Sequence, residues 1–537
     1  TATLPSAAYV ARESYGYFFG PRIITQNATL TNIDLSGVSL VGANFTGSNL
    51  TTATLTNTDI SGVLFTGTTL TGLITGGVSA GAGAGVTAPT LPSGYVVRAG
   101  FIVGPNVNLV NANLSNTDLS GQSIAGTTVT GANFTGATLT RLVTGGLVNA
   151  GTATLPAGYV IRNGFIVGPG VSLASAVLTN VDLSGISLAN TVMTNTDISG
   201  ASTILTRLAS GGITNLTTAT LPTGYVARNG YIIGAGVNAT GAALSSATLT
   251  SVNMTGIDLS GAVLSSSTMT SANLTNANLT NATASNVIMT SANFTGATMA
   301  SANLSNSFLS STNLTNANLT SATLTGAYMV TTNLTNTVLT GAILTSMTVQ
   351  GGLIGVTTAT LPTGYVARTI TTATNGFIIG PRLSIQSATL TGVDLSGVTL
   401  TSANFTSSNF TNANLANADI SGAIFTSTTL TGLRSGGLIG GTTATLKTGY
   451  IVRNTGGASG TGFMIGAGVN LAGTDLSGID MSGVVLTSTD FQNANMTNTS
   501  LRNATLTTAN LSGANITGIL TGGITGLATA TLPSAVY

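Results

Sequence analysis

The residues that could carry acid–base or nucleophilic chemistry are few in this chain. It contains no His, no Cys and no Trp, which excludes imidazole bases, thiol nucleophiles, disulfides and the usual zinc ligands. The acidic residues that remain are Asp residues and Glu13. The repeat described below explains the spacing of the Asp residues, so no pair of them indicates a catalytic site. The glycine-rich stretch from Gly81 lacks the Gly-Lys-Ser/Thr of a phosphate loop. We therefore expect no enzymatic activity, no cofactor and no metal site.

The charge content limits the class of partner. Charged residues make up 5% of the 537 residues and the formal net charge is +1, whereas ordinary globular domains carry about 25% charged residues. Such a surface attracts neither a phosphate backbone nor an anionic membrane. Small polar residues also interrupt every apolar run before the roughly 18 residues that a membrane-spanning helix needs. We expect no nucleic-acid partner and no membrane insertion.

A period of five residues organises most of the chain. From Leu244 to Val349, every fifth residue is apolar, and Ala, Val, Ser or Thr usually stands two positions earlier. This spacing matches neither a helix nor a strand. A second period of twenty residues relates Asn253, Asn273, Asn293, Asn313 and Asn333. Four units of five would complete one square coil, and with coils stacked about 4.8 Å apart the Asn column would form a ladder of side chains.

These units, among them SANLT, NANLT and NIDLS, resemble the A(D/N)LXX units of pentapeptide-repeat proteins. The resemblance implies a right-handed quadrilateral β-solenoid, with the central Leu or Phe and the small residue two before it pointing inward. The expected fold class is all-β, a solenoid of pentapeptide repeats interrupted by β-hairpin modules. Some members of the family imitate DNA and shield topoisomerases, but the twelve acidic residues of this chain do not supply the acidic surface that this role requires.

A second phrase separates the solenoid blocks. Sequences such as LPAGYVIRNGFIVG recur from residues 4, 91, 155, 221, 361 and 446. Two short apolar strands around Asn-Gly or Ala-Gly predict a β-hairpin, and each hairpin opens a block. We divide the chain into blocks 1–86, 87–151, 152–217, 218–357, 358–442 and 443–528, followed by a joining strand at 529–537.

The few charges recur at fixed positions in these blocks. Each hairpin has one Arg in its first strand, and in five blocks an Asp follows the first aromatic residue of the second strand by seventeen positions. When the extra residues of the longer turns are left out of the count, the Asp follows the Arg by about twenty residues, which is one coil. We predict structural ion pairs between the hairpin and the next coil. The alternative is that both are solvated charges whose pairing contributes little. The predicted pairs are Arg98 with Asp118, Arg162 with Asp182, and Arg368 with Asp394.

The outward face of residues 241–349 is nearly neutral, with Asp258 as its one charged residue. Low surface charge favours self-association. Ile288, Phe308 and Tyr328 stand twenty residues apart at outward positions, which predicts an apolar stripe for a lateral contact with another subunit or block. The alternative is relaxed selection at a loosely constrained position.

The two ends of the chain carry the same phrase, TATLPSAAY from Thr1 and TATLPSAVY from Thr529. A solenoid end leaves backbone groups unpaired, and neither end offers a charged or helical cap. We predict that one copy continues the next by strand addition, and that this head-to-tail contact produces an open filament. The predicted junction residues are Thr1, Leu4, Tyr9, Thr529, Leu532 and Tyr537.

The expected function is that of a non-enzymatic structural protein, extracellular or at the cell surface, that forms a filament, sheath or appendage. Its partner is a further copy of itself, with glycans or neighbouring filaments as additional partners. The first alternative is a fibre-like adhesin or viral tail fibre that binds a receptor through the stretched hairpin loops at 13–16, 369–376 and 454–462. Ice binding through a flat Thr array is a third alternative, although the clearest column is Asn.

Overall fold

The computed structural model describes residues 8–81, 87–350, 352–369, 375–454 and 461–534. The chain divides into two compact units, Thr1–Ala239 and Thr240–Tyr537. Their boundary falls inside the predicted block 218–357, after its hairpin, and the division into six blocks stays a prediction. Among the described residues, no helix has the length and apolarity needed to cross a bilayer.

Each pentapeptide builds one side of a coil. Ala272 and Leu274 are buried, while Asn273 between them points outward and forms a bridge to the neighbouring coils. The N–H of Ala272 donates to the carbonyl of Met269 at 3.0 Å, which closes a β-turn at the corner. Ser271 in this turn has a φ of 56°, a left-handed conformation that favours Gly and Asn and that Ser also adopts at many corners of this chain. The corner geometry therefore explains the small polar residues between apolar positions.

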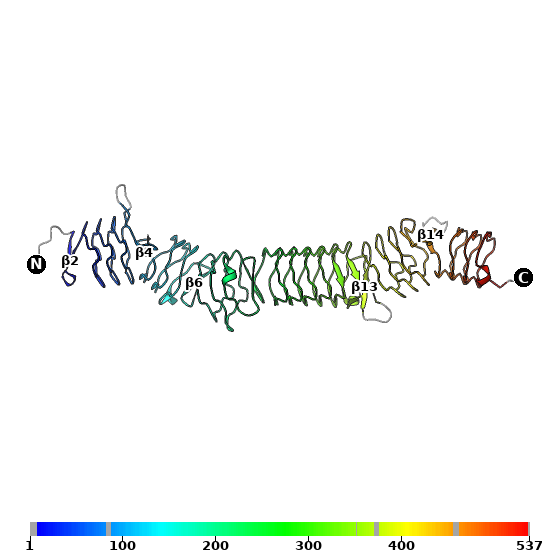
Figure 1. The fold of residues 1–537 in the computed structure, drawn as a ribbon, viewed down its shortest axis with the longest axis horizontal. Helices are drawn as coiled ribbons and strands as arrows, with labels where there is room; N and C mark the ends of the chain where they lie inside the picture. The colour runs from blue at the N-terminus through cyan, green and yellow to red at the C-terminus, as the bar shows by residue number, and fades with distance from the viewer. Residues whose placement is uncertain (1–7, 82–86, 351, 370–374, 455–460, 535–537) are drawn as a thin grey trace. The chain divides into compact units, whose positions relative to one another are not determined.

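Coils stack with a period of twenty residues. Asn273 forms parallel bridges with Asn253 and Asn293. Leu274 donates its N–H to the carbonyl of Asn293 at 2.7 Å, and Asn273 donates to Val252 at 3.0 Å. Figure 1 shows the resulting succession of coils in the green part of the second unit. The predicted quadrilateral β-solenoid is confirmed.

The core runs through the middle of the coils in each unit. In the first unit, Phe45 and Phe65 are buried and stack with ring centroids 5.7 Å apart. In the second, Phe405 and Phe425 stack at 5.4 Å. Burial of these large apolar side chains is the main favourable contribution to the fold.

The hairpins form where the second phrase predicts them. In the tight ones, both turn residues have positive φ, as at Asn163 (47°) and Gly164 (76°), which matches the twist of the strands. The hairpins pair β1 (Val10–Arg12) with β2 (Tyr17–Phe19), β3 (Val96–Arg98) with β4 (Phe101–Val103), β5 (Val160–Arg162) with β6 (Phe165–Val167), β7 (Val226–Arg228) with β8 (Tyr231–Ile233), β12 (Val366–Thr369) with β13 (Asn375–Ile379), and β14 (Ile451–Asn454) with β15 (Gly462–Ile465).

The remaining elements are short. Strands β9 (Tyr328–Val330) and β10 (Thr348–Gln350) pair in parallel on successive coils, and β11 (Leu353–Ile354) pairs with β13. Four of the five single 3₁₀ turns lead into a hairpin or lie within one, and the fifth in chain order follows the last coil. They are η1 (Glu13–Tyr15), η2 (Ala150–Thr152), η3 (Leu216–Thr218), η4 (Val356–Thr358) and η5 (Leu527–Thr529).

Candidate assembly site

A hairpin is attached to the coil before it through a short set of contacts, which we call a joint. At the joint formed by Thr144–Leu147 and Gly164–Ile166, the N–H of Leu147 donates to the carbonyl of Gly164 at 3.1 Å. The N–H of Ile166 donates to the hydroxyl of Thr144 at 3.0 Å. The ring of Phe165 lies where a Cβ on Gly145 would be, 2.8 Å away. The glycine is therefore required for the aromatic ring to pack on the backbone.

The same contacts recur at other joints within each unit. Main-chain bonds join Val78 to Gly100 (3.0 Å), Ile213 to Gly230 (3.1 Å) and Leu438 to Gly462 (2.9 Å). Hydroxyls accept from the second strand in the pairs Thr75–Ile102 (3.0 Å), Ser210–Ile232 (3.1 Å) and Ser435–Met464 (3.1 Å). Aromatic rings cover glycines in the pairs Phe101–Gly76, Tyr231–Gly211 and Phe463–Gly436. The joint is thus a repeated structural device.

The phrase before each hairpin also docks in a fixed way. At η2, the N–H of Gly131 donates to the Thr152 hydroxyl at 2.8 Å. At η5, the N–H of Thr508 donates to the Thr529 hydroxyl at 3.0 Å, and Leu511 donates to the carbonyl of Thr531 at 2.7 Å. The last described copy of the phrase therefore sits on its coil as an internal copy does.

The predicted junction residues have different surroundings. Thr1, Leu4 and Tyr537 lie outside the described residues. Tyr9 is half-buried in its own hairpin, where its hydroxyl donates to the carbonyl of Pro21 at 3.3 Å. Thr529 is held by its own coil, as described above. Leu532 is 52% exposed, whereas the equivalent Leu155 packs against the core. Tyr9 and Thr529 therefore have intramolecular roles that sequence reasoning did not predict.

The second unit ends, among its described residues, in a partly uncovered coil. Ile516 occupies an inward position but is 38% exposed, whereas Met496 directly beneath it is fully buried. Leu532 and Leu520, the latter at an outward position above Ser500, are also exposed. We call Ile516, Leu520, Thr521–Ile524 and Leu532 the C-terminal face. Sequence reasoning named only Leu532, because the loss of cover on inward residues becomes visible only when the coil is built.

The first unit has an uncovered surface on its first hairpin. Phe18 is 47% exposed, whereas Ile102 and Ile166, which occupy the same hairpin position, are fully buried in their joints. Tyr17 is also exposed, and Ile24 on the following coil is 73% exposed. We call Gly16–Phe18 and Ile24 the N-terminal face. Sequence reasoning did not assign these residues to the junction, because their exposure depends on what packs beside the hairpin.

The predicted Arg–Asp pairs come together, but the contact differs from the prediction. The Nε atom of each Arg donates to the main-chain carbonyl of its Asp, at 3.0 Å for Arg98 to Asp118 and 2.8 Å for Arg162 to Asp182. Arg368 makes the same bond to Asp394 at 2.6 Å. The ion-pair prediction was thus wrong in its acceptor, because the carboxylate turns toward the residues that follow it. We call this bond the arginine clasp.

The carboxylates belong to the corners of the coil. Asp118 accepts from the N–H of Ser120 at 2.9 Å, and Asp182 accepts from that of Ser184 at 2.8 Å. Bonds from the serine hydroxyl and the serine N–H lower the pKa of each carboxyl, and the neighbouring Arg charge lowers it further. The Asp side chains therefore stay ionised and stabilise a turn.

The Asn column forms the predicted ladder. The Nδ2 atom of Asn293 lies 3.4 Å from Oδ1 of Asn273 and donates to the Thr275 hydroxyl at 3.0 Å. Asn313 donates to Asn293 at 3.2 Å. Each Asn also accepts from the N–H two residues later, as from Thr295 at 3.1 Å. The side chains therefore connect successive coils and close their own corners.

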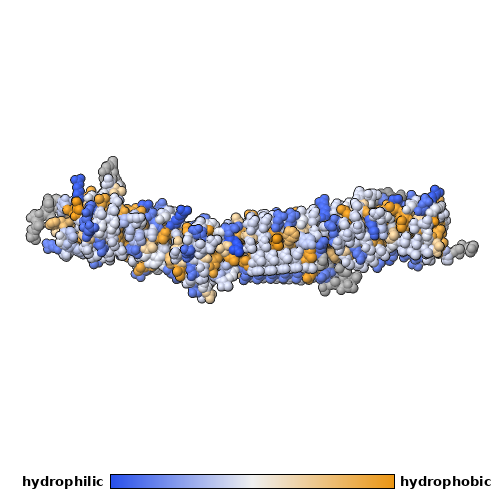
Figure 2. Space-filling model, viewed as in Figure 1, coloured by the Kyte–Doolittle hydropathy of each residue, from blue (hydrophilic) through white to orange (hydrophobic). Residues whose placement is uncertain are grey.

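The predicted apolar stripe lies in one column of the second unit. Ile288 forms parallel bridges with Thr268 and Phe308, and Phe308 with Tyr328. Ile288 and Phe308 are exposed, and the rings of Phe308 and Tyr328 lie 6.3 Å apart. Most of the visible surface in the middle of Figure 2 is pale, apart from a hydrophilic row along its lower edge and small hydrophobic patches. A lateral contact on the stripe remains a prediction.

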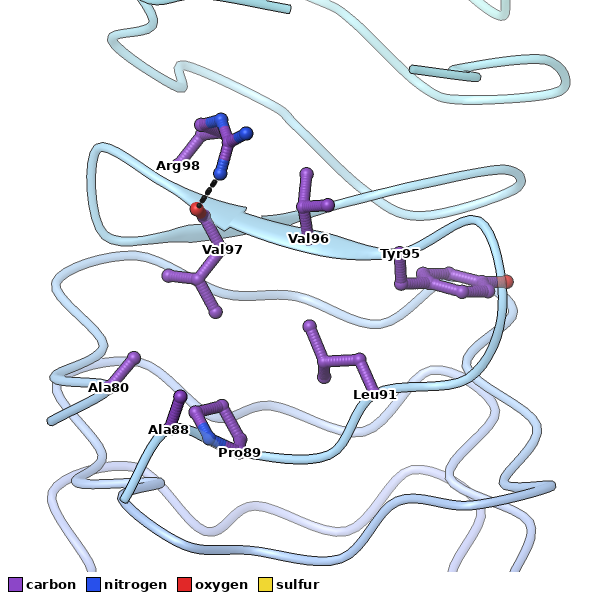
Figure 3. A pocket seen from close by; sticks show the side chains of 8 residues that line it. All are labelled: Ala80, Ala88, Pro89, Leu91, Tyr95, Val96, Val97 and Arg98. Carbon is purple, nitrogen blue, oxygen red and sulfur yellow. Dashed lines mark hydrogen bonds between the residues drawn. The ribbon is translucent and has the colours of Figure 1, made fainter. Parts of the chain in front are cut away.

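A groove lies beneath strand β3. It has a volume of about 470 Å³ and is lined by Ala80, Pro89, Leu91 and Tyr95–Arg98, among others. Figure 3 shows Leu91 and Val97 on its walls and the Arg98 guanidinium bonded to the Val97 carbonyl. A similar groove lies beneath β7, with Leu221, Tyr225 and Arg228 in its lining. The grooves are therefore consequences of how the hairpin lies over the preceding phrase.

The described residues provide little for catalysis. Among them, no group of three or more His, Cys, Asp or Glu side chains could hold a metal ion. Burial raises the pKa of Tyr95 and Tyr159, so these phenols stay neutral as hydrogen-bond donors. The arrangement as a whole supports packing of one coil on another.

Comparison with known proteins agrees with this fold. The family model of pentapeptide repeats matches residues 26–72, 106–141, 171–202, 235–265, 272–310, 312–346, 386–432, 467–503 and 486–519, which is more than half of the chain. No curated protein matches the chain in a sequence comparison.

Similar solved structures are also pentapeptide-repeat proteins. HetL, involved in heterocyst differentiation regulation in the cyanobacterium Nostoc, is 18% identical over 67% of this chain and 92% of its own, with a TM-score of 0.14. QnrB1, a plasmid-mediated fluoroquinolone resistance protein, is 15% identical over 52% and 91%, with a TM-score of 0.12. A protein of the Arabidopsis thaliana thylakoid lumen is 30% identical over 20% and 63%, with a TM-score of 0.10. This chain belongs to the pentapeptide-repeat family.

Proposed function

We propose that this protein is a non-enzymatic structural protein that assembles end to end into an extracellular or cell-surface filament, sheath or appendage. The observation that carries the proposal is the C-terminal face. Its phrase docks as the internal copies do, yet Leu532 is 52% exposed where Leu155 and Leu221 pack against a core. A further coil on this face would cover Leu532 in the way that Leu155 and Leu221 are covered.

The N-terminal face supplies a matching surface. Phe18 is 47% exposed, although its counterparts in the internal joints are fully buried. The two faces differ from one another, so a contact between them is heterologous, and a heterologous contact that does not close into a ring generates a filament. The low charge of the chain supports the proposal, because little electrostatic repulsion opposes close association of copies.

The adhesin alternative depends on the three stretched hairpin loops. In the first, Tyr15 donates its hydroxyl to the carbonyl of Thr31 at 2.7 Å, so the loop is bonded to its own coil. Residues 370–374 and 455–460 of the other two loops lie outside the described residues. The described part of these loops therefore offers no observation that favours receptor binding. We retain the filament as the proposal.

The test is the assembly state of the purified chain. We expect light scattering to report multimers that grow with protein concentration, and negative-stain electron microscopy to show filaments with the chain as their repeat. A variant that tests the C-terminal face is Leu532→Ser, which removes an exposed apolar residue and should raise the concentration needed for assembly. A monodisperse monomer at high concentration, without filaments, would overturn the proposal.

A further inference from the structure

We propose that the filament contact reproduces the internal joint in one defined register. This inference rests on the proposed function. The segment Thr521–Ile524 of one copy receives the hairpin segment Gly16–Phe18 of the next copy. Leu520 of the first copy then lies beside Ile24 of the second, as Val143 lies beside Ser172 in the parallel bridge of an internal joint.

The first argument is an open position above a glycine. At the internal joints, an aromatic ring occupies the space where a Cβ on the first glycine of the Gly-Gly pair would lie, as Phe165 does at Gly145. Gly522 has the same place in Thr521–Ile524, but nothing lies within 4 Å of its Cβ position. Tyr17, the aromatic residue at the equivalent position of the first hairpin, is exposed. The ring and the open position are therefore complementary.

The second argument concerns hydrogen bonds. Thr75 and Thr144 are buried and accept from the N–H groups of Ile102 and Ile166. Thr521 has the equivalent position and is exposed. In the proposed register its hydroxyl accepts from the N–H of Phe18.

The main chain extends this match. Ile524 corresponds to Val78 and Leu147, whose N–H groups donate to Gly100 and Gly164. In the proposed contact, Ile524 donates to Gly16. The φ of Gly16 is 71°, close to the 77° of Gly100 and the 76° of Gly164, so all three glycines share the left-handed conformation.

The third argument is the chemistry of the outward pair. At the internal joints the bridged pair always contains a polar residue on the hairpin side. These pairs are Ile74–Asn108, Val143–Ser172, Ala209–Asn238, Thr348–Ser384 and Arg434–Asn470. The proposed pair, Leu520 with Ile24, is apolar on both sides, and Ile24 is 73% exposed. An exposed Ile at this register is accounted for by an apolar residue on a second copy.

The absence of Cys from the chain makes disulfide trapping a direct test. Two single-cysteine proteins, Ile24→Cys and Leu520→Cys, are mixed under assembly conditions and oxidised. Residues paired across a parallel ladder lie within the range that a disulfide can span. We expect a crosslinked species that contains one copy of each variant, at least tenfold more abundant than in the control. The control replaces Leu520→Cys by Val485→Cys, an exposed outward residue on a coil beneath the face.

The outcomes separate this register from the proposed function. Crosslinking at residues 24 and 520 above the control supports the register. Filaments without this crosslink, or with equal crosslinking of the control, overturn the register but leave end-to-end assembly intact. The absence of both filaments and crosslinks would overturn the register and the proposed function together.

A charge pair provides a second measurement. Leu520→Lys places a charge on the C-terminal face and should raise the concentration needed for assembly at least tenfold. Mixing it with Ile24→Asp should restore assembly toward the wild-type value, because the two charges then face one another. Val485→Lys should leave assembly unchanged. Failure of the Asp variant to restore assembly, with both proteins folded by circular dichroism, overturns the register.

Discussion

The uninterrupted stack of residues 241–350 and the hairpin joints are two solutions to the same problem, the addition of one coil to another. In the stack, Leu274 donates to Asn293 and the Asn ladder runs alongside. At a joint, the main-chain ladder continues, since Ser172 donates to the carbonyl of Leu142 at 2.9 Å, but an aromatic ring on glycine takes the place of the Asn ladder. The arginine clasp then bonds the same hairpin to the coil that follows it.

The difference teaches what continuation of the solenoid requires. The stack depends on a pattern repeated at every corner, whereas a joint depends on two short segments that recognise one another. Because these segments are separated in sequence by a hairpin of variable length, the contact does not depend on how the chain reaches it. This independence makes a joint between two molecules physically reasonable.

The largest expected effect removes a core side chain from the stack. Phe294 is fully buried, and Phe294→Ala should lower the free energy of unfolding by about 3–5 kcal/mol, because it leaves a cavity between coils. Phe308→Ala is the matched control, since Phe308 is exposed and should cost much less. Chemical denaturation measures both. Equal losses would contradict the assignment of inward and outward positions.

The next effect concerns the joint. Gly145→Ala puts a Cβ 2.8 Å from the ring of Phe165, and the ring must move at a cost of about 1–3 kcal/mol. Gly151→Ala lies in the same region with nothing within 4 Å of its Cβ and should change stability by less than about 0.5 kcal/mol. Thermal unfolding of the two variants compares them. A similar stability for both would show that the aromatic packing is dispensable.

The Asn ladder should contribute less than either. Asn293→Ala removes the bonds to Asn273 and Thr275 together with its corner bond, for a loss of about 1–2 kcal/mol. Asn108→Ala removes a corner bond to the N–H of Val110 and serves as the reference. The excess loss at Asn293 in urea denaturation measures the ladder. Equal stability losses for the two variants would show that the Asn ladder adds nothing to the main-chain contacts that the stack and the joint share.

The arginine clasp should be weaker still. Arg162 donates to the carbonyls of Asp182 and Ile161, at an exposed position where such bonds contribute about 0.5–1.5 kcal/mol. Arg162→Ala should therefore increase hydrogen exchange at Asp182 and its neighbours more than it lowers global stability. Arg207→Ala, a substitution of an arginine outside the hairpins, is the control. Unchanged exchange near Asp182 would show that the clasp does not hold the hairpin.

Acid should produce the smallest effect. Bonds from the Ser184 hydroxyl and N–H lower the pKa of Asp182, and the charge of Arg162 lowers it further. A carboxyl with a lowered folded-state pKa stabilises the fold fully above its unfolded pKa of about 3.9, and this stabilisation is lost as the pH falls through the folded-state value. Unfolding temperatures should thus be flat at neutral pH and fall below about pH 4. Asp182→Asn should flatten that decline slightly, and an unaltered decline would contradict it.

Much of the fold could be predicted because each position of the repeat has one fixed place in the coil. The resemblance of the five-residue units to pentapeptide repeats implied that Leu274 and Ala272 point inward. The twenty-residue period predicted the Asn273–Asn293 contact, and Asn163-Gly164 predicted a tight hairpin. These follow from local turn geometry and backbone pairing, which depend on residue type and spacing.

Other features of the candidate site could not be predicted in this way. The arginine clasp ends on the carbonyl of Asp182 because the carboxylate is already engaged by Ser184, a choice between acceptors a few ångströms apart. Tyr9 was assigned to a junction, but its ring packs on Gly20 of its own hairpin. Both depend on side-chain rotamers that spacing does not specify.

The sequence by itself determined the number of residues in a coil, the faces of its side chains and the places where hairpins interrupt it, since these depend on contacts that repeat. Only the tertiary structure decided which copies of a repeated element are covered. Phe18 and Ile166 occupy the same position in the same phrase, and Ile516 and Met496 the same position in a coil, yet one of each pair is exposed. Burial depends on the neighbouring coil, which a periodic sequence does not reveal.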